Sequence, residues 1–373
     1  MSDKFLRSIF EMVIFVQPAL ALYRVKFFEE LLRRDIQLHV FSSTMKLYGI
    51  GVKEESLTWA TTLGEIRNIC GLIFWQTGVS KIQLGPGDTL VVSGAARFAS
   101  TFYLIFRAKL RGAKVIWWGH AMKDSLFKRI IYKAVFPYID LILFYTDREV
   151  RSEKKSIPRK VSLGALNNGL DASEIRTLRS TYQSSSRANE LLFIGRLTKK
   201  VDFRNVIRAI SEADVPVVLH IIGDGEERDL CKKMAGECGV ECRVIFHGPL
   251  TEEKKIAAIA NRCLAAIYPG AVGLSLIHYM MYGLPVLIPD RIDHMPEFAA
   301  FSKEKSGYMY GEDHKSLRDT ISYVIQEGRA LNNSISRENV AITDQSYNMS
   351  DMANRFIRLS EPLTFSNHEV SGS

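Results

Sequence analysis

Three glycine-containing loops carry the residues with the clearest chemical potential, and each follows an apolar segment. The stretch 264–290, LAAIYPGAVGLSLIHYMMYGLPVLIPD, joins an apolar run to a small-residue loop and then to residues with helical spacing. The first backbone N–H groups of such a helix have no partners within the helix and lie at the positive end of its dipole, so they can bind an anion. The sequence therefore predicts an anion site formed by Gly270, Ala271, Val272, Gly273 and Leu274.

The second loop is basic. Gly195 and Arg196 end the segment LLFIGR, and Lys199 and Lys200 follow closely. A glycine lets a ligand approach the backbone, and a guanidinium and an ammonium group within one loop suit a pyrophosphate. A solvated basic turn is the alternative interpretation.

The third loop contains Gly223, Asp224, Gly225 and Glu226, between the apolar segment VVLHII and a helical pattern. It can present N–H groups to a ligand, and Glu226 could accept hydrogen bonds from a base or a ribose. A plain strand-to-helix turn with an acidic residue at the helix start is the alternative. The spacing is not the Gly-x-Gly-x-x-Gly fingerprint of dinucleotide-binding proteins, which argues against a dehydrogenase.

Two isolated side chains also follow apolar segments. His120 comes after KVIWW, where a histidine can donate to a sugar hydroxyl or face a developing charge, although a lone histidine is often structural. Glu297 follows VLI at a short distance and could bind ligand hydroxyls or cap a helix. Of the five cysteines, Cys238 and Cys242 have ligand-like spacing, but no second Cys/His pair accompanies them, so we expect free thiols and no bound metal.

The elements that must position these residues alternate between apolar strands and amphipathic helices. Strands are expected in the first half at 10–16, 36–41, 89–93, 114–118, 141–145 and 161–166. The alternation restarts at 191 and continues to 290, after a polar, serine-rich stretch at 176–190 that reads as a linker. Strand–helix–strand units imply parallel sheets, so we expect an α/β protein with two doubly wound Rossmann-like domains facing a cleft that holds the ligand.

Composition limits the class of protein and its partners. The chain has 373 residues, 47% hydrophobic and 24% charged, which suits a soluble protein of two domains. Residues 1–190 hold 28 Lys and Arg against 17 Asp and Glu, so this half is basic and the remainder slightly acidic. A basic half suggests nucleic acid or an anionic membrane surface as partner, and a merely solvated basic face is the alternative.

The same composition favours a cytoplasmic location. No apolar run approaches the roughly 18–20 residues of a membrane-spanning helix, and no secretory signal is evident near the first residues. A sparse, odd number of cysteines fits a reducing compartment.

Several motifs together resemble a known family. FIGRL followed by lysine, IIGDGEE, VIFHGPL and YPGAVGLSLIHYMMYGLPVLI are similar to the second domain of retaining glycosyltransferases of the GT-B fold, closest to glycosyltransferase family 4. In the first half, QPALALYRVKFFEELLRR, VIWWGHAMK and ALNNGLD are similar to the branch that builds bacterial surface polysaccharides. The resemblance covers nearly the whole chain, and its motifs are specific in combination.

This resemblance implies a domain plan and an activity. The plan is an acceptor-side domain at 1–180, a nucleotide-sugar-binding domain at 190–344, a C-terminal helix at 345–362 that packs back on the first domain, and a disordered tail at 363–373. The activity is metal-independent hexosyl transfer, with retention, from a nucleotide-diphosphate sugar to a glycan or polyprenyl-linked acceptor. The context is lipopolysaccharide or exopolysaccharide synthesis by a peripheral protein on the inner face of the cell membrane. No cofactor and no nucleic acid are expected, since the nucleotide sugar is a substrate.

The resemblance also implies site roles. Arg196 and Lys199, or Lys200 in its place, would neutralise the donor diphosphate, and His120 would lie beside the transferred sugar. Arg196, Lys199 and His120 are therefore the expected catalytic residues. The expected donor-binding residues are Gly195, Lys200, Gly223, Asp224, Gly225, Glu226, Gly270, Ala271, Val272, Gly273, Leu274, His278 and Glu297.

The chain departs from the family at two positions. Members commonly carry two glutamates separated by seven residues, and Gly270 and His278 stand at those places here. Gly270 has no side chain for a sugar hydroxyl, whereas His278 can still bind a ribose, and Glu297 is the candidate for restoring a carboxylate. A non-catalytic sugar-nucleotide-binding relative or scaffold is therefore the main alternative, followed by a sugar-nucleotide epimerase or a phosphorylase of the same fold.

Overall fold

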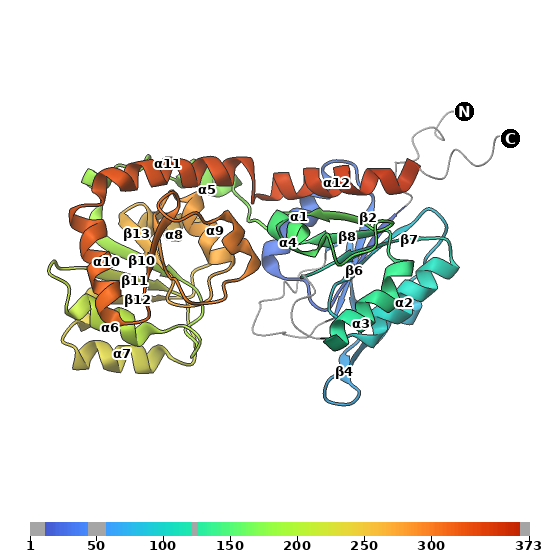
Figure 1. Cartoon of the computed structure of the whole chain (residues 1–373), viewed down its shortest axis with the longest axis horizontal. Coiled ribbons are helices and arrows are strands. Elements are labelled where there is room, and N and C mark those ends of the chain that lie inside the picture. The colour runs from blue at the N-terminus through green and yellow to red at the C-terminus, as the bar shows by residue number, and fades with distance from the viewer. Residues whose placement is uncertain (1–11, 44–56, 121–125, 366–373) are drawn as a thin grey trace. The chain divides into compact units, whose positions relative to one another are not determined.

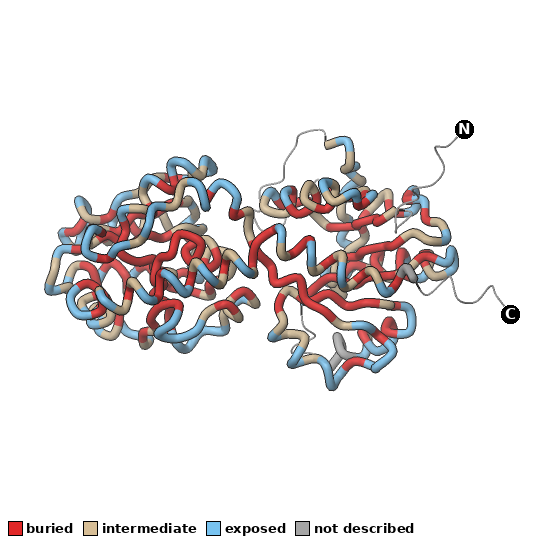
Figure 2. Tube along the Cα trace, turned by 90° about the horizontal axis from the view of Figure 1, so that it is seen from above, coloured by how far each residue is buried: buried red, intermediate tan, exposed pale blue. Residues whose placement is uncertain are grey.

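The computed structural model describes residues 12–43, 57–120 and 126–365 and divides into two compact units (Figure 1). Unit 1 comprises Met1–Asn167 and Met349–Ser373, and unit 2 comprises Asn168–Asn348. In each unit the buried backbone runs through the centre and the exposed residues lie around it (Figure 2). Both units are built on parallel sheets, which confirms the predicted fold class of two Rossmann-like α/β domains.

Unit 1 contains a seven-stranded parallel sheet in the order β3-β2-β1-β6-β7-β8-β9. Its strands are β1 (Val13–Gln17), β2 (Leu38–Ser43), β3 (Ala60–Leu63), β6 (Thr89–Ser93), β7 (Lys114–Trp118), β8 (Leu141–Phe144) and β9 (Ser162–Ala165). Its helices are α1 (Leu22–Leu32), α2 (Ala99–Leu110), α3 (Leu126–Val135), α4 (Asp147–Glu153) and α12 (Met349–Phe365), with 3-10 turns η1 (Val79–Lys81) and η2 (Phe136–Tyr138). An antiparallel hairpin joins β4 (Ile66–Asn68) to β5 (Phe74–Gln76).

The last helix completes the core of unit 1. Phe356 of α12 is fully buried, and its ring centroid lies 5.5 Å from that of Phe15 in β1 and 6.1 Å from that of Phe27 in α1. The helix runs from Met349 to Phe365, so it begins four residues later and ends three residues later than the expected 345–362, and the tail from 366 lies outside the described residues. Residues at the two ends of the chain therefore share one hydrophobic core.

Unit 2 contains a six-stranded parallel sheet in the order β12-β11-β10-β13-β14-β15. Its strands are β10 (Ala188–Ile194), β11 (Val218–Ile222), β12 (Val244–Gly248), β13 (Cys263–Ile267), β14 (Val286–Pro289) and β15 (Gly307–Tyr310). Its helices are α5 (Ser173–Leu178), α6 (Phe203–Ser211), α7 (Arg228–Glu237), α8 (Glu253–Ala260), α9 (Leu274–Met281), α10 (His314–Gln326) and α11 (Arg329–Gln345), with 3-10 turns η3 (Ser184–Ser186), η4 (Glu241–Arg243) and η5 (Pro296–Ala300).

Helices cover both faces of the unit 2 sheet, because successive side chains of a strand point to opposite faces. Leu191 and Phe193 of β10 pack with residues of α6, α7 and α10, whereas Leu192 packs with residues of α5, α8 and α9. The apolar run 191–194 of β10 follows from burial on both sides.

The boundary between the units differs from the expected linker at 176–190. Ile175 is buried in the unit 2 core, the Tyr182 hydroxyl donates to the Leu264 carbonyl (2.7 Å), and the Arg187 guanidinium donates to the Ala260 carbonyl (2.8 Å). The serine-rich stretch is thus fixed to unit 2, and the division falls between Asn167 and Asn168. Composition alone does not reveal such long-range hydrogen bonds.

Within the described ranges, every helix is too short or too polar to cross a bilayer.

Candidate functional site

The strand order of the unit 2 sheet reverses direction between β10 and β13. The chain leaves β10 toward β11 and β12 on one side, and β13, β14 and β15 lie on the other side. In doubly wound sheets, ligands bind beyond the carboxyl ends of the strands at such a reversal. The loops after β10 and β13 meet at this point, and both were predicted from the sequence as ligand-binding.

The loops after β10 and β11 touch through their backbones. A Cβ atom added to Gly223 would lie 1.9 Å from the Gly195 carbonyl oxygen, and one added to Gly225 would lie 2.1 Å from the Leu197 carbonyl oxygen. The Leu197 N–H also donates to the Asp224 carbonyl (3.1 Å). The two loops therefore form one continuous surface, and their backbones can approach this closely only because positions 223 and 225 are glycine.

The loop after β13 joins the same surface. The Asp202 N–H donates to the Pro269 carbonyl (2.7 Å), and a Cβ atom on Gly270 would lie 2.8 Å from the Lys200 carbonyl oxygen. A glutamate at position 270 would thus press on the backbone of the basic loop. This contact is a physical reason for the glycine at a position where the resemblance implies a glutamate.

The predicted basic residues lie on the exposed side of this surface. Arg196, Lys199 and Lys200 are all exposed. Lys199 also borders a cavity of about 520 Å³ that Asp202, Glu227 and other residues of α6 and α7 line. The basic charge is therefore accessible to a ligand at the carboxyl edge.

The first turn of α9 faces the edge without a side-chain cap. Gly273 is the N-cap residue and provides no side-chain hydrogen bond to the helix. The loop is held from behind, because the Val272 N–H donates to Nδ1 of His294 (3.3 Å) and the Met295 N–H donates to the Val272 carbonyl (3.0 Å). Burial lowers the pKa of His294, which keeps the ring neutral and able to accept.

Glu297 lies behind this loop. Its side chain is buried, and its Oε1 accepts a hydrogen bond from the Asn168 amide (2.6 Å). Its Oε2 would lie 3.5 Å from a Cβ atom on Gly273. The carboxylate therefore supports the loop, and its contact with a ligand stays a prediction.

His278 belongs to a hydrogen-bonded group of α8 and α9, which cover one face of the unit 2 sheet. Its Nε2 lies 2.9 Å from Oε1 of Glu253 in α8, and the Tyr282 hydroxyl donates to that same oxygen (2.6 Å). Burial opposes ionisation of Glu253, but the bonds from His278 and Tyr282 lower the pKa of this carboxyl below its ordinary value. Glu253 was not predicted from the sequence, because its only local signal is an acidic residue at the start of a helix.

His120 lies at the carboxyl edge of the unit 1 sheet, directly after β7. Its ring centroid is 4.4 Å from that of Tyr145, and its Nδ1 is 3.9 Å from Oε1 of Glu149. Desolvation by the surrounding residues and the positive charge of Arg24 lower the pKa of His120, although its side chain is 57% exposed. The imidazole is therefore neutral at pH 7.

Arg24 lies at the same edge of the unit 1 sheet and was not predicted from the sequence as a site residue. Its guanidinium lies 4.3 Å from the ring centroid of Trp118 and donates to Oε1 of Gln17 (2.9 Å) and to the Tyr145 hydroxyl (3.1 Å). These partners come from the ends of three strands, so no local sequence pattern connects them. Arg24 fixes the ring against which His120 packs.

One group of possible metal ligands occurs in the described part of the chain. Glu190, His220 and Cys263 are buried with their ligand atoms within 4.8 Å of one another. Glu190 already accepts from Arg262 (2.6 Å) and pairs with His220 (3.1 Å), and burial raises the pKa of the Cys263 thiol. A guanidinium beside a protonated thiol disfavours a cation, so we assign no metal to this group.

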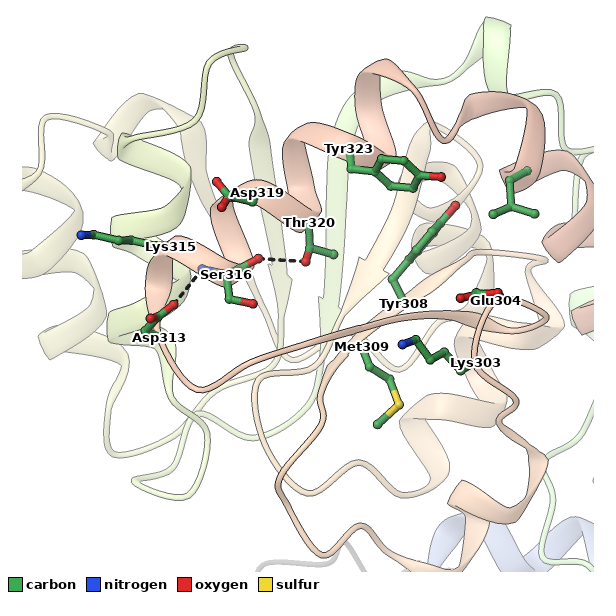
Figure 3. A pocket seen from close by; sticks show the side chains of 11 residues that line it. Lys303, Glu304, Tyr308, Met309, Asp313, Lys315, Ser316, Asp319, Thr320 and Tyr323 are labelled. Atoms are coloured by element: carbon green, nitrogen blue, oxygen red, sulfur yellow. Dashed lines mark hydrogen bonds between the residues drawn. The ribbon is translucent and has the colours of Figure 1, made fainter.

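A larger cavity lies elsewhere in unit 2. It has a volume of about 800 Å³, between β15 and α10, and Figure 3 shows Tyr308 and Tyr323 at one end and Lys315 at the other. Asp313 accepts from the Ser316 N–H (2.7 Å) as the N-cap of α10. The lining charges are of mixed sign and include none of the predicted site residues, so we assign no function to this cavity.

Comparison with protein families gives one match. Residues 174–340, which lie within unit 2, match the family described as "Glycosyl transferases group 1". The lipopolysaccharide 1,6-galactosyltransferase of Salmonella typhimurium is 29% identical over 108 residues. That alignment covers 26% of this chain and 29% of the relative, so it spans less than a third of the relative's length.

Solved structures resemble the chain over most of its length. One is the lipopolysaccharide outer core galactosyltransferase WaaB in its apo form, with a TM-score of 0.62, 14% identity, and 93% of this chain and 98% of that chain covered. HepE of Anabaena in complex with UDP-glucose gives a TM-score of 0.64 at 14% identity, with 95% and 99% covered. The pneumococcal O-GlcNAc transferase GtfA in complex with UDP and GlcNAc gives a TM-score of 0.69 at 11% identity, with 95% and 99% covered. At these identities the likeness shows the fold, which is that of GT-B glycosyltransferases.

Proposed function

We propose that the chain is a glycosyltransferase that moves a sugar from a nucleotide-diphosphate donor to a glycan or a polyprenyl-linked acceptor, with retention and without a metal ion. The observation that carries this proposal is the contact of three loops at the carboxyl edge of unit 2, beside the uncapped start of α9. The match of residues 174–340 to group 1 glycosyl transferases supports it.

The donor diphosphate would lie on the backbone N–H groups of residues 270–274, with Arg196 and Lys199 as its cationic partners. Negative charge grows on the leaving nucleoside diphosphate as the glycosidic bond breaks, so groups placed around it lower the barrier. Lys200 and the loop 223–226 would border the same ligand. We assign no enzyme nucleophile, and retention follows if the acceptor attacks from the side of the leaving group.

A uridine diphosphate sugar is the first donor to test. HepE is titled as a complex with UDP-glucose, and GtfA as a complex with UDP and GlcNAc. The relative in Salmonella is a lipopolysaccharide galactosyltransferase, which supports a role in lipopolysaccharide or exopolysaccharide synthesis. His120, neutral at pH 7, would lie beside the transferred sugar and donate to one of its hydroxyls.

We expect Arg196→Ala to lower kcat/KM for transfer at least about 100-fold, as removal of one stabilising donor in other enzymes does. The measurement is the release of nucleoside diphosphate and of glycosylated acceptor from a panel of nucleotide sugars. Arg208→Ala is the matched control, since Arg208 is an exposed arginine on α6 in the same unit. Full activity of Arg196→Ala would contradict the proposal.

A non-catalytic nucleotide-sugar-binding protein is the second candidate, because Gly270 and His278 replace the two common glutamates. Calorimetric binding of a nucleotide sugar, without turnover against any acceptor of the panel, would favour it.

We further propose that unit 1 docks on an anionic membrane from the cytoplasmic side. Unit 1 holds 27 Lys and Arg against 17 Asp and Glu, whereas unit 2 holds 22 against 24. The tip of the β4–β5 hairpin also exposes Ile69, Leu72 and Ile73. Basic charge together with exposed apolar side chains is the combination that anionic lipid surfaces attract.

A further inference from the structure

Glu253 is a carboxylate held from one side only. Both His278 and Tyr282 hydrogen-bond to its Oε1, and these residues lie one helical turn apart, His278 in α9 and Tyr282 at its C-cap. Among the described residues, nothing hydrogen-bonds to Oε2. The side chain is 18% exposed, and Oε2 is not among the fully buried polar atoms that lack a partner in the described part of the chain.

The position of Glu253 relates it to the proposed diphosphate site. α8 and α9 follow the parallel strands β12 and β13, so both helices begin at the carboxyl edge of the sheet. His278 lies four residues after Leu274, which is about 6 Å along the helix axis. The ribose of a nucleotide is bonded directly to the first phosphate, so a diphosphate on the start of α9 places the ribose near the level of His278.

A carboxylate at this level suits the two hydroxyls of a ribose. An ionised carboxylate accepts hydrogen bonds at both oxygens, and acidic residues bind ribose hydroxyls in other doubly wound nucleotide sites. Since His278 and Tyr282 occupy both lone pairs of Oε1, Oε2 and its two lone pairs remain to accept from the two ribose hydroxyls. The pairing also leaves His278 with its Nε2 occupied.

The other carboxylates near the edge fit this role less well. Asp224 accepts from the Gly225 N–H (2.8 Å) and from Arg228 (3.3 Å), which turns it toward its own loop. Glu297 is buried against Asn168. Glu226 is exposed, and within the described part of the chain no side-chain hydrogen bond orients it.

We propose that Glu253 binds the ribose hydroxyls of the donor nucleotide and that His278 and Tyr282 are positioning residues that hold its carboxylate. The inference rests on the proposed function, and it replaces direct ribose binding by His278. The resemblance implies a glutamate at the position of His278, where this chain has none. Glu253 of α8 thereby supplies a carboxylate next to that position.

The test is the ratio of affinities for UDP and 2′,3′-dideoxy-UDP, measured by calorimetry, with GDP and ADP and their dideoxy forms in parallel. The full-length protein should prefer the ribonucleotide about 10- to 100-fold, since hydrogen bonds to a charged group are strong. Glu253→Gln should bring this ratio to about threefold or less, because the amide is neutral. Glu252→Gln is the matched control: Glu252 is the preceding residue, 66% exposed and bound to Lys255, so the ratio should not change.

Two positioning variants complete the experiment. Tyr282→Phe and His278→Ala should each reduce the ratio, and His278→Gln, which keeps a donor, should restore part of it. Unfolding midpoints within a few degrees of the parent protein are required of each variant, and Glu253→Gln is close to isosteric. If Glu253→Gln binds UDP with an unchanged ratio, the inference is wrong and the proposed function stands. If the parent protein binds none of the three diphosphates, the proposed function itself fails.

Discussion

The contact between Gly225 and the Leu197 carbonyl is the residue-scale feature on which the site depends most directly. There is no space for a Cβ atom there, so the loops after β10 and β11 approach closely only because the side chain is absent. The same argument applies at Gly223, whose φ of 136° is also unfavourable for other residues. Glycine in these loops is therefore required by packing, whether or not a ligand is bound.

Gly225→Ala tests this contact. We expect a loss of roughly 1–3 kcal/mol in the free energy of unfolding of unit 2, because the added methyl group must displace backbone. Gly236→Ala is the control, since a Cβ atom there meets no other atom within 4 Å, and alanine should be neutral or stabilise the helix by up to ~1 kcal/mol. Urea denaturation of both variants measures the difference, and equal stability would contradict the close approach.

The β4–β5 hairpin exposes apolar side chains at its tip. Leu72 is 80% exposed and Ile69 58% exposed, while Phe74 N–H donates to the Arg97 carbonyl and so fixes the base of the hairpin to the start of α2. On α2, Phe106 and Leu110 are also exposed, at 55% and 70%. An apolar tip on a fixed base is suited to insertion into a lipid interface.

Leu72→Asp should therefore weaken co-sedimentation with anionic vesicles at least about tenfold, because one leucine side chain contributes about 1.5–3 kcal/mol on burial. Leu22→Asp is the control, since Leu22 is 49% exposed on α1, which packs in the other core cluster of unit 1. Binding of the parent protein should also decrease at high salt, where basic residues are screened. Equal binding of Leu72→Asp and the parent protein would exclude insertion of the tip.

At the scale of the whole molecule, the chain crosses between its units twice. It leaves unit 1 after Asn167 and returns after Asn348, and the returning helix α12 inserts Phe356 among Phe15, Phe27 and Trp118. Unit 1 is therefore complete only when residues from both ends of the chain are present, whereas unit 2 is continuous in sequence.

Phe356→Ala should destabilise unit 1 by about 3–5 kcal/mol through the cavity that it leaves. We expect thermal unfolding in two steps, since proteins with separate cores commonly depart from two-state behaviour, and only one step should shift. Ile321→Ala, in the fully buried core of unit 2, should shift the other step by about 2–5 kcal/mol. A common shift of a single transition in both variants would show that the units unfold together.

The periodicity of the sequence predicted most of the strands and helices near the carboxyl edges of the two sheets. The expected strands at 89–93 and 114–118 coincide with β6 and β7, and the strand, glycine loop and helix at 264–290 coincide with β13, the loop and α9 within one residue. Burial on one or both faces imposes these patterns on neighbouring residues, so they can be read locally. The missed elements include β15, α10 and α11, although Asp313 and the spacing of Leu317, Ile321 and Val324 indicate a helix there.

Only the tertiary structure decided which residues meet. His278 and Glu253 are 25 residues apart and Arg24 and Tyr145 are 121 apart, and no periodicity relates either pair. From the sequence, Gly270 only departs from the glutamate that the family resemblance implies. In the fold, this glycine permits contact with the backbone of Lys200. The sequence by itself thus determined the α/β class and the position of the glycine loops, because these depend on near neighbours. The partners of each polar group depend on how distant strands align in the sheet, and that alignment is fixed only when the chain folds.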